Sequence, residues 1–241
     1  MKTWLNLAEH LCQRPFLTPN NPVIMNLKSG KLKPDTGKEV LKQYYYLVVM
    51  IVEFLTIAMV RTPFDEVYKE LRRNLGEELG SRTEGLPHQW IFEHLVRLEM
   101  RIDIRAPWSK TTSNFINKLL LRFHTDSPIF VVGMIYALES TACPELVRVA
   151  EIINLVAAEP IVDITKLHDS AYVAKLDEPD RRGNLTNFLA MHVVDFEVGH
   201  QKGLQKALKP HVREDWDEFF HGFVYILDEM AVWWEGLSRG E

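Results

Sequence analysis

Cysteine is scarce in this sequence, since only Cys12 and Cys143 occur among its 241 residues. Neither belongs to a C-x-x-C pair or a zinc-type cluster, which excludes a disulfide framework and a cysteine-based structural zinc site. Glycine and proline contribute 12 residues each. That low share excludes a collagen-like, linker-rich or mostly disordered chain. Because the thiols are so few, we expect a reducing, cytoplasmic location.

Excess positive charge and long uninterrupted apolar runs are also missing. The net charge of −5 argues against nucleic acid or an anionic membrane as the main partner. The most apolar stretch, residues 44–60, is interrupted by Glu53 and falls short of the roughly 20 residues of a membrane helix. We interpret it as a buried core helix. The first 14 residues do not have the pattern of a signal peptide.

Helical periodicity dominates the chain and convincing strand alternation is absent, so we expect an all-α protein. The pattern predicts a short helix over residues 2–12, followed by a coil. Seven core helices are then expected over residues 35–61, 63–79, 87–101, 110–123, 128–157 with a kink at Pro144, 185–208 and 212–237. No composition shift marks a further boundary, so we expect a single helical domain over residues 35–241 after an extension over residues 1–34. The irregular residues 158–184 are typical of a functional segment such as a lid.

Common nucleotide-binding and hydrolase motifs are lacking, and a set of carboxylates and histidines on the predicted helices stands out instead. Glu139 is the only charge between Ile129 and itself, and burying an unpaired carboxylate costs several kcal/mol. It should therefore be protonated, paired, metal-bound or at a helix edge facing water. Glu78 closes one predicted helix and His88 opens the next. A turn at Gly80 can bring these two side chains together, although both could instead be exposed.

The sixth core helix carries four more candidates: His192, Asp195, Glu197 and His200. On an ideal helix the two imidazoles lie about 80° apart and about 12 Å along the axis. That separation is too long for one ion but suits two ions about 3.5–4 Å apart. The alternative is a polar helix face without a ligand role. A set of carboxylates and imidazoles without thiolates suits iron or manganese better than structural zinc.

As a set, these features resemble the heme-oxygenase-like diiron oxidases, and within them the CADD-like proteins. The resemblance covers residues 35–237 and extends more distantly to TenA and pyrroloquinoline quinone synthase proteins. It rests on the helix number, Glu-Glu-x-Gly at residues 77–80, Tyr-x-x-Glu at residues 136–139, and His…carboxylate-x-x-His at residues 192–200. It implies a seven-helix heme-oxygenase-like bundle. The family's ligand pattern matches Glu78, His88 and Glu139 here, with a Glu-x9-His spacing that some members share.

The last motif departs from the family's His-x-x-x-Asp-x-x-His. Here Glu197 follows His192 with one residue too many, and it replaces aspartate. A single π-type bulge would absorb the extra residue and return Glu197 and His200 to the face of His192. The alternative pairs His192 with Asp195 and leaves the role of His200 open.

The resemblance implies a non-heme iron oxidase or oxygenase that uses O₂ as co-substrate on a small organic molecule. Two iron ions, with manganese as the other suitable metal, would be bound by Glu78, His88, Glu139, His192, Glu197 and His200, or by Asp195 in place of Glu197. Glu53 and Tyr136 are expected to line the substrate pocket. A homodimer is a common state in the family.

Several alternatives fit the residues less well. A ferritin-like diiron bundle needs Glu-x-x-His motifs in alternation, whereas Glu197-x-x-His200 and Glu218-x-x-His221 lie on consecutive helices. Heme is disfavoured because no histidine lies between residues 12 and 86. A TenA-type hydrolase needs a nucleophilic cysteine, and neither cysteine is clearly placed for that role. The second hypothesis is a metal-free CADD-like or TenA-like helical protein that binds a small molecule or a protein partner.

Overall fold

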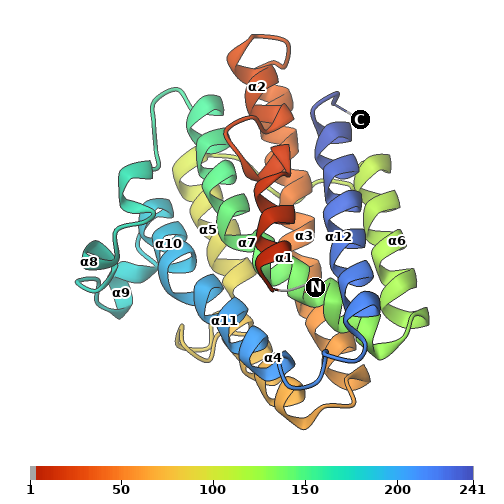
Figure 1. Ribbon diagram of the computed structural model, residues 1–241. Coiled ribbons are helices and arrows are strands. Elements are labelled where there is room, and N and C mark those ends of the chain that lie inside the picture. Colours follow the sequence, from red (N-terminus) through yellow and green to blue (C-terminus); the bar gives the residue numbers. More distant parts are fainter. Residues whose placement is uncertain (1–3, 241) are drawn as a thin grey trace.

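Helix α7 (Pro128–Val156) runs through the middle of the computed structural model, which describes residues 4–240 (Figure 1). Its sequence is apolar on most sides, so neighbouring helices cover it all round. Ser127 caps its N-terminus by accepting a hydrogen bond from the Phe130 amide. Pro144 lies inside α7, and the helix continues past it to Val156.

Two long helices flank α7, namely α3 (Pro34–Arg61) and α12 (Trp216–Leu237) (Figure 1). The backbones of α7 and α12 touch, because a Cβ atom on Gly133 would meet the Phe219 carbonyl. Gly222 makes the reciprocal contact from α12. By length and composition alone α3 and α7 could span a membrane, but both pack against other helices of the bundle.

Three further helices surround this core, and their bounds lie within two residues of the prediction. They are α4 (Asp65–Glu78), α5 (His88–Met100) and α6 (Lys110–Thr125). The turn after α4 depends on Gly80, whose φ of 100° favours glycine. This turn places the end of α4 beside the start of α5, as the sequence predicted.

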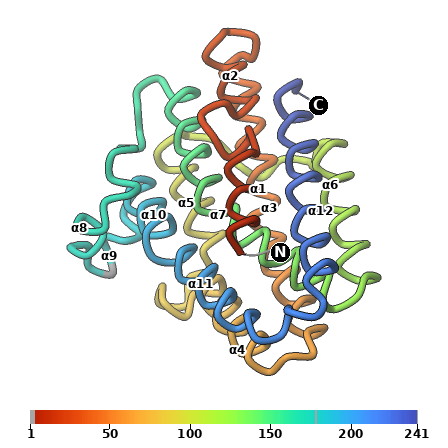
Figure 2. Tube along the Cα trace, viewed as in Figure 1, coloured from red at the N-terminus to blue at the C-terminus, as the bar shows by residue number. Residues whose placement is uncertain are grey.

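The predicted sixth helix is one continuous rod with a π-helical turn inside it (Figure 2). It consists of α10 (Leu185–Met191), the π-turn η3 (His192–Phe196) and α11 (Glu197–Leu208). The rod packs against α4 and α7. The predicted bulge is therefore confirmed, at the position where the sequence holds one residue too many.

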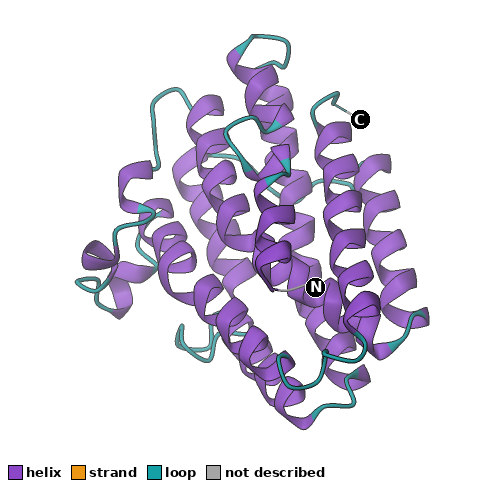
Figure 3. Cartoon of the chain, viewed as in Figure 1, coloured by secondary structure: helices purple, strands orange, loops and turns teal. Residues whose placement is uncertain are grey.

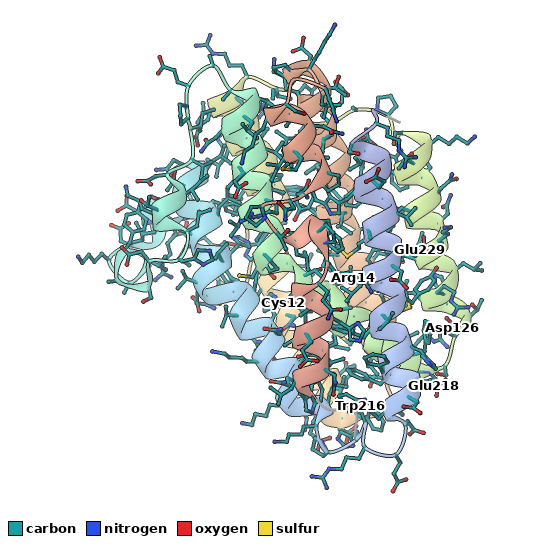
Figure 4. All side chains as sticks on the ribbon, turned by 45° about the horizontal axis from the view of Figure 1, so that its top comes forward. Cys12, Arg14, Asp126, Trp216, Glu218 and Glu229 are labelled. Carbon is teal, nitrogen blue, oxygen red and sulfur yellow. The ribbon has the colours of Figure 1, made fainter. Side chains whose placement is uncertain are left out.

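The N-terminal region contains more helix than expected. After α1 (Trp4–Cys12), the predicted coil holds the 3-10 turn η1 (Pro15–Leu17) and helix α2 (Pro22–Lys28). The prolines begin these elements instead of breaking them, because proline suits the first turn of a helix. Val23 and Ile24 are fully buried where α2 meets α7. Cys12 is exposed at the end of α1 (Figure 4).

Residues 158–184 are not structureless, because short helical pieces interrupt the chain there. They are η2 (Ile164–Lys166), α8 (Ser170–Val173) and α9 (Glu178–Arg181). All three contact α10. Within residues 4–240 the structure contains helices, turns and loops and no strand, which confirms the all-α prediction (Figure 3).

Candidate metal centre

The π-turn decides which residues of the sixth helix point inward. The Glu197 amide donates to the carbonyl of His192, five residues earlier, instead of four. This wider turn keeps His192, Glu197 and His200 buried on one face. Asp195 stays on the outer face, where its half-exposed carboxylate pairs with Arg82 at 2.7 Å. The structure therefore places the alternative ligand Asp195 away from the buried face of the sixth helix.

Glu139, Glu197 and His200 bring their ligand atoms within 4.8 Å of one another. The Nδ1 atom of His200 lies 3.2 Å from Glu139 Oε2 and 4.0 Å from Glu197 Oε2. All three side chains are buried. This triad has the donor types and the spacing that one metal ion needs.

Glu78 connects this triad to a second group. Its Oε1 lies 4.0 Å from His200 Nδ1, and its Oε2 lies 3.4 Å from His88 Nδ1. His88 in turn faces His192, with 3.1 Å between Nδ1 and Nε2. The structure thus brings all six predicted ligand residues together. We call this set the buried cluster: Glu78, His88, Glu139, His192, Glu197 and His200.

The ring of His192 has a fixed orientation. Its Nδ1–H donates to the Phe188 carbonyl at 2.8 Å, so the lone pair lies on Nε2, which faces His88. Burial, with the nearby His88 ring, lowers the pKa of His192 to about 3. The ring is therefore neutral near pH 7, which is the form that binds metals.

The carboxylates of the buried cluster are crowded. Burial opposes the charge on His200, but Glu139, Glu77 and Glu197 outweigh it and hold the pKa of His200 well above its usual value. Burial, reinforced by Glu78 and Glu139, raises the pKa of Glu197 well above normal despite the attraction of His200. Burial alone would raise the pKa of Glu78, but His88 and His200 lower it to about 2.

Outside the cluster, Glu77 holds His200 in place. The Nε2–H of His200 donates to Glu77 Oε2 at 3.2 Å. Arg73 and Arg82 support Glu77 from the outer side, at 2.6 and 3.6 Å. Burial alone would raise the pKa of Glu77, but His200 and Arg73 lower it to about 2. A carboxylate behind a histidine in this way is typical of metal sites.

Asn74 supports the triad in the same manner, since its Nδ2 donates to Glu139 Oε1 at 3.1 Å. Sequence reasoning did not predict a role for either supporting residue. The signal for them was their spacing, because Asn74, Glu77 and Glu78 share one face of α4 at i, i+3 and i+4.

A cavity of about 80 Å³ lies against the buried cluster and is lined by five of its six members. Its other polar lining residues are Tyr44 of α3 and Glu145 of α7. Burial, with the nearby Glu145 and Glu197, raises the pKa of Tyr44 well above its usual value, so its hydroxyl stays protonated. The remaining walls are apolar: Leu47, Val48, Ile51, Phe92, Leu138, Ala142, Leu146 and Phe188.

Neither of the two predicted pocket residues, Glu53 and Tyr136, lines this cavity. Glu53 is exposed, because the lining face of α3 runs at i, i+3, i+4 and i+7 from Tyr44 to Ile51 and leaves Glu53 on the opposite side. Tyr136 is buried but points from α7 toward the N-terminal region. Its ring packs against Trp4 and Phe219. The sequence signal that would have found Tyr44 is its place on the apolar stripe of α3.

The ferritin-like and thiol-based alternatives have no support in the geometry. Glu218 lies at the N-terminal end of α12, where it accepts a hydrogen bond from Ser127 (Figure 4). Burial raises the pKa of Cys143 to about 11, so its thiol stays protonated. Cys143 also does not line the cavity.

The donor set fits divalent cations. Three carboxylates and three imidazoles converge from α4, α5, α7 and the sixth-helix rod, and no lysine or arginine among residues 4–240 pairs with Glu78, Glu139 or Glu197. In addition, the buried Nε2 atom of His88 has no hydrogen-bond partner. Hard oxygen and imidazole donors suit iron and manganese.

Residues 15–240 match the model of a protein family, DUF3865. This family is described as a domain of unknown function with a solved structure. The chain belongs to this family. It is 21% identical over 226 residues to 4-chloro-allylglycine synthase of Streptantibioticus cattleyicolor, covering 91% of this chain and 77% of that protein.

Solved structures show the same fold. A CADD-like protein of unknown function from Nostoc punctiforme superposes with a TM-score of 0.83 at 23% identity, covering 98% of this chain and 95% of that one. A TenA homolog from Pseudomonas syringae pv. tomato gives a TM-score of 0.59 at 14% identity, covering 97% and 91%. The resemblance to CADD-like and TenA proteins is therefore confirmed, as is the helical bundle it implied.

Proposed function

We propose that this protein is a non-heme iron oxidase or oxygenase that acts on a small organic substrate in the cavity beside the buried cluster. The observation that carries the proposal is the cluster itself, in which three carboxylates and three imidazoles meet at an apolar cavity. The likeness to a synthase over 91% of the chain supports an enzymatic function.

The cluster divides into two ligand groups. Glu139, Glu197 and His200 would hold one ion, since their ligand atoms already lie within 4.8 Å of one another. Glu78, His88 and His192 would hold the second, with Glu78 within reach of both groups. Iron bound in this way would supply the binding and activation of O₂.

The other residues prepare the site. Glu77 accepts a hydrogen bond from the Nε2–H of His200, so that Nδ1 of His200 faces the carboxylates of the cluster. The Phe188 carbonyl does the same for His192, so that its Nε2 faces inward. The apolar walls of the cavity exclude water, which strengthens every electrostatic interaction inside it.

Metal binding tests the proposal directly. Protein purified without oxygen is titrated with Fe(II), in parallel with Mn(II), and the bound metal per chain is measured. We expect about two iron ions per chain, followed by a transient absorbance when O₂ is added. Glu139→Gln should remove at least one ion. Glu151→Gln, on the same helix but outside the cavity, should bind as the wild type does.

Two results would overturn the proposal. One is the absence of specific iron uptake, which would favour a metal-free binding protein. The other is iron uptake that Glu139→Gln leaves unchanged, which would place the metal elsewhere. Unfolding temperatures of each variant show that a loss of metal does not follow from a loss of fold.

A further inference from the structure

Glu145 is a buried carboxyl that the metal centre does not use. It lies on α7 six residues after Glu139, which is about 9 Å along a helix axis. Its side chain is only 2% exposed and lines the same cavity as the buried cluster. The indole N–H of Trp234 donates to its Oε1 at 2.7 Å.

No positive charge balances this carboxyl. Among residues 4–240, no lysine, arginine or histidine forms an ion pair with Glu145, and the neighbour that interacts with it electrostatically in the cavity is another acidic residue, Glu197. Burial raises the pKa of Glu145 to about 8, although its hydrogen-bonding contacts with Trp234 and Thr141 lower it. A buried acid is costly unless something pairs with it.

Packing alone does not account for an acid here. The indole of Trp234 needs a single acceptor, which an amide or a hydroxyl oxygen supplies without the cost of an ionisable group. Around Glu145 the cavity wall is apolar, formed by residues such as Leu138, Ala142 and Leu146. Within an apolar cavity, a single acid determines which polar group of a ligand is accepted.

We infer that Glu145 binds the ammonium group of the substrate, which is a slender aliphatic primary amine. The inference rests on the proposed function, because the other end of the amine then lies at the buried cluster. An ammonium group supplies the missing positive charge and donates up to three hydrogen bonds.

The size and shape of the cavity restrict the rest of the molecule. Its volume of about 80 Å³ is about half that of an apolar cavity that holds benzene, roughly 150 Å³. A ring or a branched chain is therefore too large for it as it stands. A linear methylene chain between Glu145 and the cluster fills it with matching apolar surface.

Binding of simple probes tests the inference without turnover. n-Propylamine, n-butylamine and n-pentylamine are titrated into metal-free and Mn(II)-loaded protein by calorimetry, beside the alcohol and the carboxylate of equal chain length. We expect the amines to bind at least about tenfold more tightly than the alcohols. The carboxylates should not bind. Glu145→Gln keeps the shape and an acceptor for Trp234, and should weaken amine binding by at least about tenfold.

Two controls keep the test decisive. Ala142→Leu fills the cavity and leaves Glu145 intact, so it should also abolish amine binding. Glu151→Gln should have no effect. Equal binding of amine and alcohol by the wild type would overturn the inference whether or not Glu145→Gln folds. So would amine binding that folded Glu145→Gln retains.

The outcomes separate this inference from the proposed function. Metal content is measured on the same samples. Amine binding that depends on Glu145 in a protein without specific metal uptake would contradict the metal centre alone. Normal metal uptake with amine binding indifferent to Glu145 would contradict the substrate class alone.

Discussion

The amide of Glu197 donates to the carbonyl of His192 five residues earlier, and this one wide turn aligns the sixth helix with the rest of the cluster. Without it, the extra residue after His192 would rotate Glu197 and His200 by about 100°. Their contacts with Glu139 and Glu78 would then be lost. The π-turn thus accommodates the one extra residue between His192 and Glu197.

Deleting Val194 should convert the π-turn into a regular α-helical turn. Val194 lies inside the turn and is half-buried. Its removal leaves three residues between His192 and Glu197, a spacing that a regular helix places on one face. We expect the deletion variant to keep its iron content, measured per chain after anaerobic loading.

The matched control deletes Gly199, which lies between Glu197 and His200 outside the π-turn. This deletion rotates His200 away from Glu139 and should lower the iron content. Loss of iron in the Val194 deletion together with retention in the Gly199 deletion would contradict the assigned role of the turn.

The six cluster residues were predictable because their signals are local. Glu139 is the only charge in the apolar stretch of residues 129–139, and Glu78 and His88 flank a glycine turn. The bulge was predictable as well, since one residue too many must be absorbed somewhere between His192 and Glu197. Ligand roles themselves stay a prediction until metal binding is measured.

The pocket was not predictable in the same way. Glu53 drew attention as a charge in an apolar helix, but charge does not show which way a helix faces when most of its sides are apolar. Tyr136 precedes Glu139 by three residues, which turns its ring by about 60° toward Trp4 instead of the cavity. The direction of these two side chains depends on tertiary packing, which the periodicity of the sequence does not show.

Glu77→Gln should weaken metal binding although Glu77 is not a proposed ligand. The variant keeps an oxygen for the Nε2–H of His200 but loses the charge that Arg73 and Arg82 hold in place. Changes of this kind lower metal affinity about 10–100-fold. Competition with a chelator measures the affinity. Glu70→Gln also removes a partner of Arg73, without contacting His200, and an equal loss there would contradict the positioning role.

Gly133→Ala and Gly222→Ala should each destabilise the bundle. In both cases the added Cβ meets a carbonyl of the opposite helix, where backbone cannot move aside cheaply. Overpacking of this kind costs about 1–3 kcal/mol in the free energy of unfolding, measured by denaturant titration. Gly199→Ala is the control, since its Cβ meets nothing within 4 Å. It should raise stability by about 0.5–1 kcal/mol, and a loss there equal to the others would contradict the packing argument.

Glu145→Gln should change how the stability of the metal-free protein depends on pH. The pKa of Glu145 is about 8 in the folded state, against 4.5 for an unburied glutamate. Between these pH values the unfolded chain releases a proton that the folded protein retains. Wild-type stability should therefore be highest below about pH 4.5 in this respect and fall as the pH rises to about 8, by up to about 1.4 kcal/mol per pH unit. Glutamine removes this dependence. The free energy of unfolding of both proteins is measured against pH with a chelator present. The difference between the two curves removes the contributions of the titratable groups that both proteins share. Parallel curves would show that the acid is not held protonated in the cavity, and a difference that grows with pH would show that its charge has no partner there.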